Sequence, residues 1–288
     1  MKRFFCILSV ILLTLTGCGT TEQVNEDKLQ VYTSFYCIYD FAKKIGGDKI
    51  DVYNVIPAGT EPHDWEPTAH DMASLSKADV LFYNGLGMEH WVDKVNSSVN
   101  IKAVALSDYA EVDNQLDPHI WLDPENADDM AEGIYQVLCQ LDSENSQYYA
   151  DNYNSFKNQL ELLDDAFEQQ LQPYENSSIV VAHEAYGYMC RAYDLNQISI
   201  DGISADSEPS PQKMQEIINF IKDNNIKAVF YEELISKKTA ETIAAETNAV
   251  LLPLNSFEGL SAEEIEAGED YISVMEENLA NLKTAMEE

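Results

Sequence analysis

Three of the five histidines in this sequence follow or end strand-like runs, and two of the three stand in stiff surroundings that suit a metal ligand. His63 lies in GTEPHDWEPT, His119 lies in DPHIWLDP, and His183 lies in VAHEAYGYM. Prolines flank His63 and His119 on both sides, and proline restricts its own backbone and that of the preceding residue. An imidazole held at a fixed angle loses little entropy when it binds an ion. We predict that these histidines coordinate a metal ion, and imidazole ligands favour Zn²⁺.

A tetrahedral zinc site with three histidines has one position left, which a carboxylate can fill. Glu258 in NSFEGL follows the last strand-like run of the chain, and it is the predicted fourth ligand. Asp201, Glu232 and Glu233 follow the two strand-like runs before it. These three carboxylates remain alternatives to Glu258 on sequence grounds.

Other residues near the predicted ligands could support them. Carboxylates can fix a ligating histidine by accepting a hydrogen bond from its second ring nitrogen. Spacing does not rank the candidates, which are Asp64, Asp117, Asp123 and Glu184. Trp65 and Trp121 each follow a predicted ligand by two residues, so they could wall the site or fill the core beneath it. His70 and His90 lie in helix-like runs, and we assign them structural roles.

Eight segments rich in β-branched residues alternate with helix-like segments along the chain. They form two groups of four, at 29–35, 49–56, 78–85 and 101–106, and at 177–183, 197–203, 226–232 and 249–254. This alternation predicts an α/β fold with two lobes, each a four-stranded, mostly parallel sheet flanked by helices. In open parallel sheets, ligands bind beyond the carboxyl ends of the strands. Because the predicted ligands follow strands, both lobes would supply ligands to one cleft.

A long polar segment between the two groups of strands predicts a helix that joins the lobes. Residues 143–172 contain no glycine or proline, and large apolar residues recur there at steps of three and four. Ser143 can cap the start of this helix, and Pro173 would stop it. A rigid linking helix is the preferred interpretation, and a helical hairpin insert is the alternative.

These elements divide the chain into an N-terminal lobe at 28–142, a linking helix at 143–173 and a C-terminal lobe at 174–288. Near the end of the chain, Ser261 and Glu264 have the spacing of a capping box. The pattern predicts an amphipathic helix that begins there and runs to the last residue.

The first residues predict export and lipid attachment. Residues 1–17 combine a basic start with an apolar run too short for a comfortable membrane span, which is typical of a signal peptide. The LTGC sequence that ends at Cys18 looks like a bacterial lipobox, so Cys18 is the predicted lipid site. Residues 18–27 would then form a polar tether. A plain secretory signal is the alternative.

The remaining cysteines and the net charge limit other functions. Cys37, Cys139 and Cys190 form an odd set without a CxxC pair, so one disulfide is possible but no pairing is favoured. We expect core or free thiols. The formal net charge of −34 argues against nucleic acid as a partner and is compatible with a cationic ligand.

The ordered motifs resemble those of the zinc-binding solute-binding lipoproteins of bacterial ABC transporters, in the metal-specific class whose lobes are joined by one long helix. The resemblance is carried by GTEPHDWEPT, ADVLFYNGLGMEHW, DPHIWLDPENA, VAHEAYGYM and LPLNSFEGL, and it covers essentially the whole mature chain. It implies that His63, His119 and His183 bind the metal and that Glu258 completes the site. Manganese-type relatives typically have a carboxylate in place of the third histidine, so His183 favours zinc.

The resemblance implies a lipid-anchored protein that captures Zn²⁺ outside the cytoplasm and delivers it to a metal-specific ABC permease. We also expect a monomer without enzymatic activity, and only modest closure of the lobes because a long helix resists hinging. Two segments depart from the family pattern. LSDYAEVDNQL, before His119, is short and lacks histidine, and LNSFEGL lacks the proline and leucine that relatives more often have before the glutamate.

Three other functions compete with zinc capture. The first is capture of Mn²⁺ by a member of the same class. The second is a secreted zinc hydrolase, although HEAYG has Gly187 where an HExxH motif has its second histidine. The third is adhesion at the cell surface, which would be an additional role. The position of Glu258 separates the hydrolase from the others, because a hydrolase keeps a water molecule at the fourth position.

Overall fold

The computed structural model describes residues 28–112, 117–203 and 209–287. The predicted signal peptide at 1–17, the lipid site Cys18 and the tether at 18–27 lie outside the described residues. Within the described ranges, no helix combines the length and the apolar character needed to cross a membrane.

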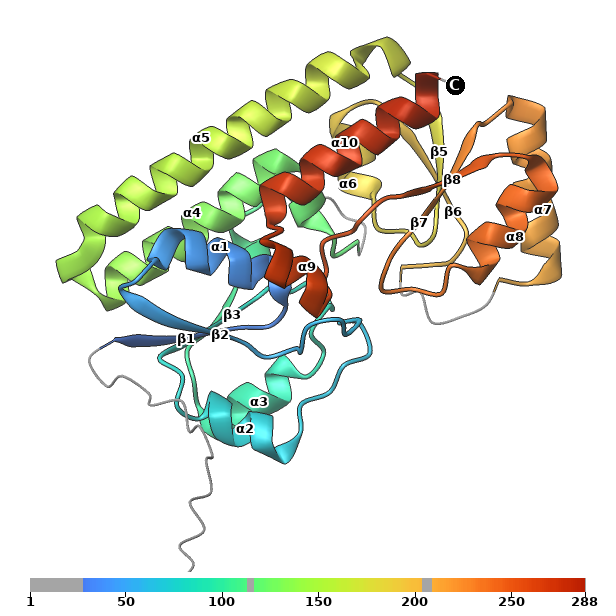
Figure 1. The fold of residues 1–288 in the computed structure, drawn as a ribbon. Helices are drawn as coiled ribbons and strands as arrows, with labels where there is room; N and C mark the ends of the chain where they lie inside the picture. The colour runs from blue at the N-terminus through green and yellow to red at the C-terminus, as the bar shows by residue number, and fades with distance from the viewer. Residues whose placement is uncertain (1–27, 113–116, 204–208, 288) are drawn as a thin grey trace, which may run out of the picture.

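The N-terminal lobe is a four-stranded parallel sheet with helices on both faces (Figure 1). Its strands are β1 (Leu29–Thr33), β2 (Ile50–Asn54), β3 (Val80–Tyr83) and β4 (Ala103–Ala105). They pair in the order β2-β1-β3-β4, and every neighbouring pair is parallel. Its helices are α1 (Tyr36–Gly46), α2 (Ala69–Leu75), α3 (Val92–Val99) and α4 (Pro124–Leu141).

Both faces of this sheet are buried, because successive strand residues point to opposite sides. Val31 and Phe82 belong to the large core that includes α1 and α4. Tyr32 and Leu81, one position along each strand, pack with α2 and α3. This explains why the interior strand β3, with the sequence VLFY, has a large apolar or aromatic residue at every position.

The C-terminal lobe repeats this arrangement with a second parallel sheet. Its strands are β5 (Ser178–Val181), β6 (Asn196–Ser199), β7 (Ala228–Tyr231) and β8 (Val250–Pro253), paired in the order β6-β5-β7-β8. Its first helices are α6 (Gly187–Ala192), α7 (Pro211–Asn224) and α8 (Lys238–Thr247). All eight predicted strands and the parallel pairing are confirmed.

The linking helix is present as α5, at Ser146–Leu171, and its 26 residues span about 39 Å (Figure 1). It runs along α1 and α4 of the N-terminal lobe and reaches the C-terminal lobe, so it links the lobes rather than forming an inserted hairpin. The proposed cap is wrong, because Ser143 lies in a short 3₁₀ turn (Ser143–Asn145) before the helix. The helix ends just before Pro173, as predicted, and Pro173 lies in a second 3₁₀ turn that follows the helix.

The C-terminal segment contains two helices instead of the single helix expected from the sequence. The capping box of Ser261 and Glu264 is confirmed at the start of α9 (Ala262–Ala267). Gly268 then adopts a left-handed conformation with φ of 87°, which ends α9. The chain resumes as α10 (Tyr271–Glu287), which lies beside α5 (Figure 1).

One hydrophobic core extends through both lobes. It contains residues of β1 and α1, the buried face of α5, and residues of β7 and α10. At the start of α10, the backbone N–H of Tyr271 donates to Asp40 of α1 at 3.2 Å, and Asp270 pairs with Lys44 at 2.5 Å. The division of the chain into lobes at 142 and 174 stays a prediction. The core residues that both lobes share oppose independent movement of the lobes.

The buried face of α5 can be tested with Phe156→Ala. The Phe156 ring is 1% exposed and lies 5.2 Å from the Phe41 ring between centroids. Its loss should lower the free energy of unfolding by about 3–5 kcal/mol. Leu162→Ala on the same helix is the control, since Leu162 is 69% exposed and should matter by less than about 0.5 kcal/mol. Equal effects in chemical denaturation would contradict this packing.

Candidate metal centre

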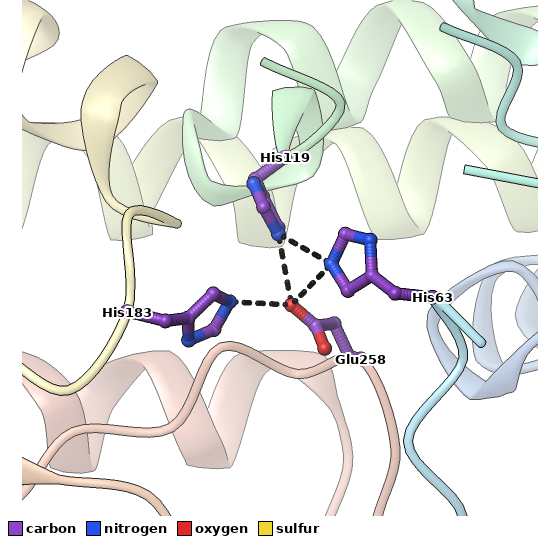
Figure 2. Close-up of side chains that lie close together, drawn as sticks. All are labelled: His63, His119, His183 and Glu258. Atoms are coloured by element: carbon purple, nitrogen blue, oxygen red, sulfur yellow. Dashed lines mark hydrogen bonds and ion pairs between the residues drawn. The ribbon is translucent and has the colours of Figure 1, made fainter. Parts of the chain in front are cut away.

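Four side chains converge from loops that follow the carboxyl ends of strands (Figure 2). His63 follows β2, His119 follows β4, His183 follows β5, and Glu258 follows β8. Both lobes therefore contribute, as the strand positions predict. The structure brings together the four residues that the sequence analysis selected.

The candidate ligand atoms have separations that suit one small ion. Oε1 of Glu258 lies 2.9 Å from Nε2 of His119 and 3.1 Å from Nε2 of His183. Nε2 of His63 lies 3.2 Å from Nε2 of His119 and 3.7 Å from the same oxygen. All four atoms lie within 4.8 Å of one another. Ligands of tetrahedral zinc, with bonds of about 2.1 Å, lie about 3.4 Å apart. The separations of 2.9–3.7 Å lie on both sides of this value.

The cluster is buried, and its most accessible member is His63. His119 is 0% exposed, His183 is 1% exposed and Glu258 is 4% exposed, whereas the His63 side chain is 9% exposed. Solvent therefore reaches the cluster most easily at His63.

A carboxylate orients each of the two buried histidines from behind. Nδ1 of His119 lies 2.7 Å from Oδ1 of Asp117, which also accepts the backbone N–H of His119 at 3.0 Å. Nδ1 of His183 lies 2.7 Å from Oε1 of Glu232. These contacts direct both Nε2 atoms toward the centre. Asp117 thus holds His119, and Glu232 orients a histidine instead of joining the cluster.

The other carboxylates near the predicted ligands have different positions. Asp123 caps α4, because its side chain accepts the backbone N–H of Glu125 at 3.0 Å. Asp64 and Glu184 are exposed. Glu233 is also exposed and pairs with Lys237 at 2.8 Å. Asp201 is half-buried and stands outside the cluster.

Two residues that the sequence analysis did not single out hold the His119 loop. Nδ2 of Asn84 donates to the carbonyl of Pro118 at 2.9 Å. The buried carboxylate of Glu89 accepts the backbone N–H of Asn84 at 2.9 Å and the hydroxyl of Ser34 at 2.6 Å. An acidic residue inside the apolar stretch GLGMEHW was the signal available in the sequence.

The histidines and the glutamate shift one another's proton affinity. Burial lowers the pKa of His119, but hydrogen bonds to Asp117 and Glu258 outweigh it and raise that pKa overall. Burial also lowers the pKa of His183, while Glu232 and Glu258 raise it well above its usual value. Burial raises the pKa of Glu258, yet His183 and the other ring nitrogens hold it well below its usual range. The surrounding rings therefore favour the ionised form of Glu258. The raised pKa values of His119 and His183 mean that metal binding displaces protons from these rings.

The loop that carries Glu258 is bonded to all three histidine loops. Residues 254–260 are named here the Glu258 segment. The Tyr186 hydroxyl and the Trp121 indole N–H each donate to it at 2.7 Å, and the backbone N–H of Gly59 donates at 2.9 Å. These donors belong to the loops of His183, His119 and His63, in that order. The accepting carbonyls are those of Leu254, Ser256 and Leu260.

The two tryptophans differ in burial. Trp121 is fully buried and its ring lies 5.4 Å from that of His119, so it fills the core and borders the cluster. Trp65 is half-buried and packs edge-on against Trp91.

The remaining histidines and the cysteines stand apart from the cluster. His70 is exposed on α2, and His90 is exposed and pairs with Glu66 at 3.0 Å, so both are surface residues. The three cysteines of the described residues are free, with Cys37 and Cys190 buried and Cys139 half-buried.

The geometry agrees with the comparisons to known proteins. The model of the family described as zinc-uptake complex component A, periplasmic (ZnuA) matches residues 31–285. This chain belongs to the ZnuA family. ZnuA-family proteins are the solute-binding components of zinc transport systems and not enzymes.

Individual relatives support this assignment over nearly the whole chain. High-affinity zinc uptake system protein ZnuA of Bacillus subtilis (strain 168) is 33% identical over 306 residues, which cover 97% of this chain and 96% of that protein. The crystal structure of the Zn(II)-bound ZnuA-like domain of Streptococcus pneumoniae AdcA has a TM-score of 0.82 at 34% identity, covering 91% of this chain and 100% of that one. This chain spans 61% of the length of full AdcA.

A further ZnuA-like structure is described as having two activities. The laminin binding protein Lmb of Streptococcus agalactiae has a TM-score of 0.83 at 30% identity, covering 90% of this chain and 99% of that one. It is described as a bifunctional protein with adhesin and metal transporting activity.

In this member of the ZnuA family, Gly187 lets the two lobes approach behind His119. Gly187 is the first residue of α6 in the C-terminal lobe. A methyl group added at Gly187 would lie 2.5 Å from Oδ2 of Asp117, so the Asp117 carboxylate would have to shift. An HExxH motif would need a histidine at position 187. Here that position is a glycine, which leaves space for the Asp117 carboxylate behind His119.

Gly187→Ala should displace Asp117 and lower the pKa of His119. The Asp117 hydrogen bond raises that pKa against the effect of burial, so its loss leaves burial to dominate. NMR titration of the histidine ring protons in zinc-free protein would measure the shift. Gly202→Ala is the control, because nothing lies within 4 Å of a methyl group added there. An unchanged His119 titration in Gly187→Ala would contradict this contact.

Proposed function

We propose that this protein captures Zn²⁺ outside the cytoplasm with His63, His119, His183 and Glu258, and delivers it to the permease of a metal ABC transporter. The observation that carries the proposal is the convergence of the three Nε2 atoms and Oε1 of Glu258 within 4.8 Å. Membership in the ZnuA family supports the transport role.

The composition of the cluster favours zinc over manganese. Mn²⁺ prefers oxygen ligands in octahedral arrangements, whereas Zn²⁺ accepts imidazole nitrogen in a tetrahedral site. The cluster offers three nitrogens and one carboxylate oxygen, all within 4.8 Å of one another. The Zn(II)-bound domain of AdcA, which has the same fold, supports the same choice.

The position of Glu258 argues against a zinc hydrolase. A catalytic zinc site has three protein ligands and keeps its fourth position for water. Oε1 of Glu258 instead lies 2.9–3.7 Å from the three ring nitrogens, where a fourth ligand belongs. We therefore infer a closed binding site whose cargo leaves unchanged.

We further infer that the mature protein is a monomer anchored by lipid at Cys18. A single chain supplies all four candidate ligands, so no second subunit is needed to complete the site. Cys18 follows an apolar run and a small residue, as in lipoproteins, and precedes a polar stretch that could act as a tether.

Zinc capture is tested with His119→Ala. Loss of an outer carboxylate typically weakens metal binding by about 10- to 100-fold, so loss of a ligand should weaken it by at least about 100-fold. Competition with a chromophoric chelator would measure the zinc dissociation constant. His90→Ala is the matched control, since His90 is exposed and paired with Glu66 outside the cluster. Unchanged zinc affinity in His119→Ala would refute the site.

Lipid attachment is tested with Cys18→Ser in cells that produce the full chain. The wild-type protein should partition with the membrane fraction and carry an acyl mass on its first residue by mass spectrometry. The variant should lack that mass, because serine has no thiol for thioether formation. Cys139→Ser should behave like the wild type. Membrane-bound, acylated protein in Cys18→Ser would show that the anchor lies elsewhere.

A further inference from the structure

The side chain of Asn278 forms a paired contact with the Glu258 segment from outside the cluster. Asn278 lies on α10 and is 2% exposed. Its Oδ1 accepts the backbone N–H of Asn255 at 2.8 Å, and its Nδ2 donates to the carbonyl of Asn255 at 2.8 Å. One carboxamide thus satisfies both backbone groups of a loop residue, in the manner of a neighbouring strand.

The next residues transmit this contact to Glu258. Oδ1 of Asn255 accepts the backbone N–H of Phe257 at 2.8 Å. Phe257 has a φ of 55°, a left-handed conformation that is unusual for a bulky residue. Its buried ring packs against Tyr36 and Tyr271, with centroids 5.7 and 5.5 Å away. Because Phe257 directly precedes Glu258, this held conformation sets the direction in which the carboxylate points.

We propose that Asn278 is a positioning residue that fixes Glu258 in place for Zn²⁺. The inference rests on the proposed zinc site and names a residue that does not contact the ion. A preorganised fourth ligand loses little entropy on coordination. It also enforces four-coordinate geometry, which Mn²⁺ does not prefer. Asn278 therefore contributes to zinc affinity and to discrimination against manganese.

Asn278→Leu removes both hydrogen bonds while keeping a similar side-chain shape. It should weaken zinc binding by about 10- to 100-fold, the range for residues that orient metal ligands. The ratio of zinc to manganese affinity should fall, because a loosened carboxylate permits other geometries. Bound Co²⁺ should lose the intense visible absorption of a tetrahedral site. Asn154→Leu, the same change at an exposed position of α5, is the matched control and should preserve all three values.

A double-mutant cycle separates positioning from a general structural role. If Asn278 acts through Glu258, Asn278→Leu should change zinc affinity by less than about twofold in a Glu258→Gln background. An equal loss in both backgrounds would overturn the proposal, and so would unchanged zinc affinity in the single variant. Asn278→Asp keeps the size and the acceptor for Asn255, so it provides the same test with a milder change if the leucine variant does not fold.

The failure of this inference is distinguishable from failure of the proposed function. If the wild-type protein binds zinc tightly and His119→Ala does not, the site stands whatever Asn278→Leu does. Wild-type affinity in Asn278→Leu would then overturn only the positioning role. Absence of zinc binding by the wild-type protein would overturn both.

Discussion

The carboxylate of Glu258 is the contact on which the rest of the structure depends. It is the point where three imidazoles from two lobes meet, and it lies within 3.7 Å of each Nε2 atom. The Glu258 segment accepts a hydrogen bond from every histidine loop. Four loops that follow four different strands are thus joined into one unit. The buried negative charge of Glu258 is favourable only when a cation or protons neutralise it.

The architecture around this contact serves rigidity more than movement. Helix α10 belongs to the last part of the chain but begins against Asp40 of the N-terminal lobe. A single hydrophobic core passes beneath both sheets and along α5. Gly187 and Asp117 meet across the lobes behind His119. A fixed cluster of this kind is what the proposed zinc site requires, because rigid geometry favours one ion over others.

Local patterns predicted the elements and the four converging residues, because β-branched runs and strand ends are encoded over a few residues. The carboxylates that hydrogen-bond the predicted histidine ligands could not be identified in the same way. Nothing in the spacing shows that Asp117 orients His119 while Asp123 caps a helix, or that Glu232 stands behind His183. These roles follow from the packing of distant segments. The helix break at Gly268 was missed, although glycine is a common signal for the end of a helix.

The order of these contacts along the chain has a consequence for biogenesis. The cluster draws on positions from 63 to 258, and the residue that braces its last member lies still later, at 278. A nascent or half-folded chain therefore contains single histidines but no chelating pocket. Bringing the four side chains together requires the closure of long loops, which costs conformational entropy. The four candidate ligands therefore come together only when segments from both lobes have packed into their shared core.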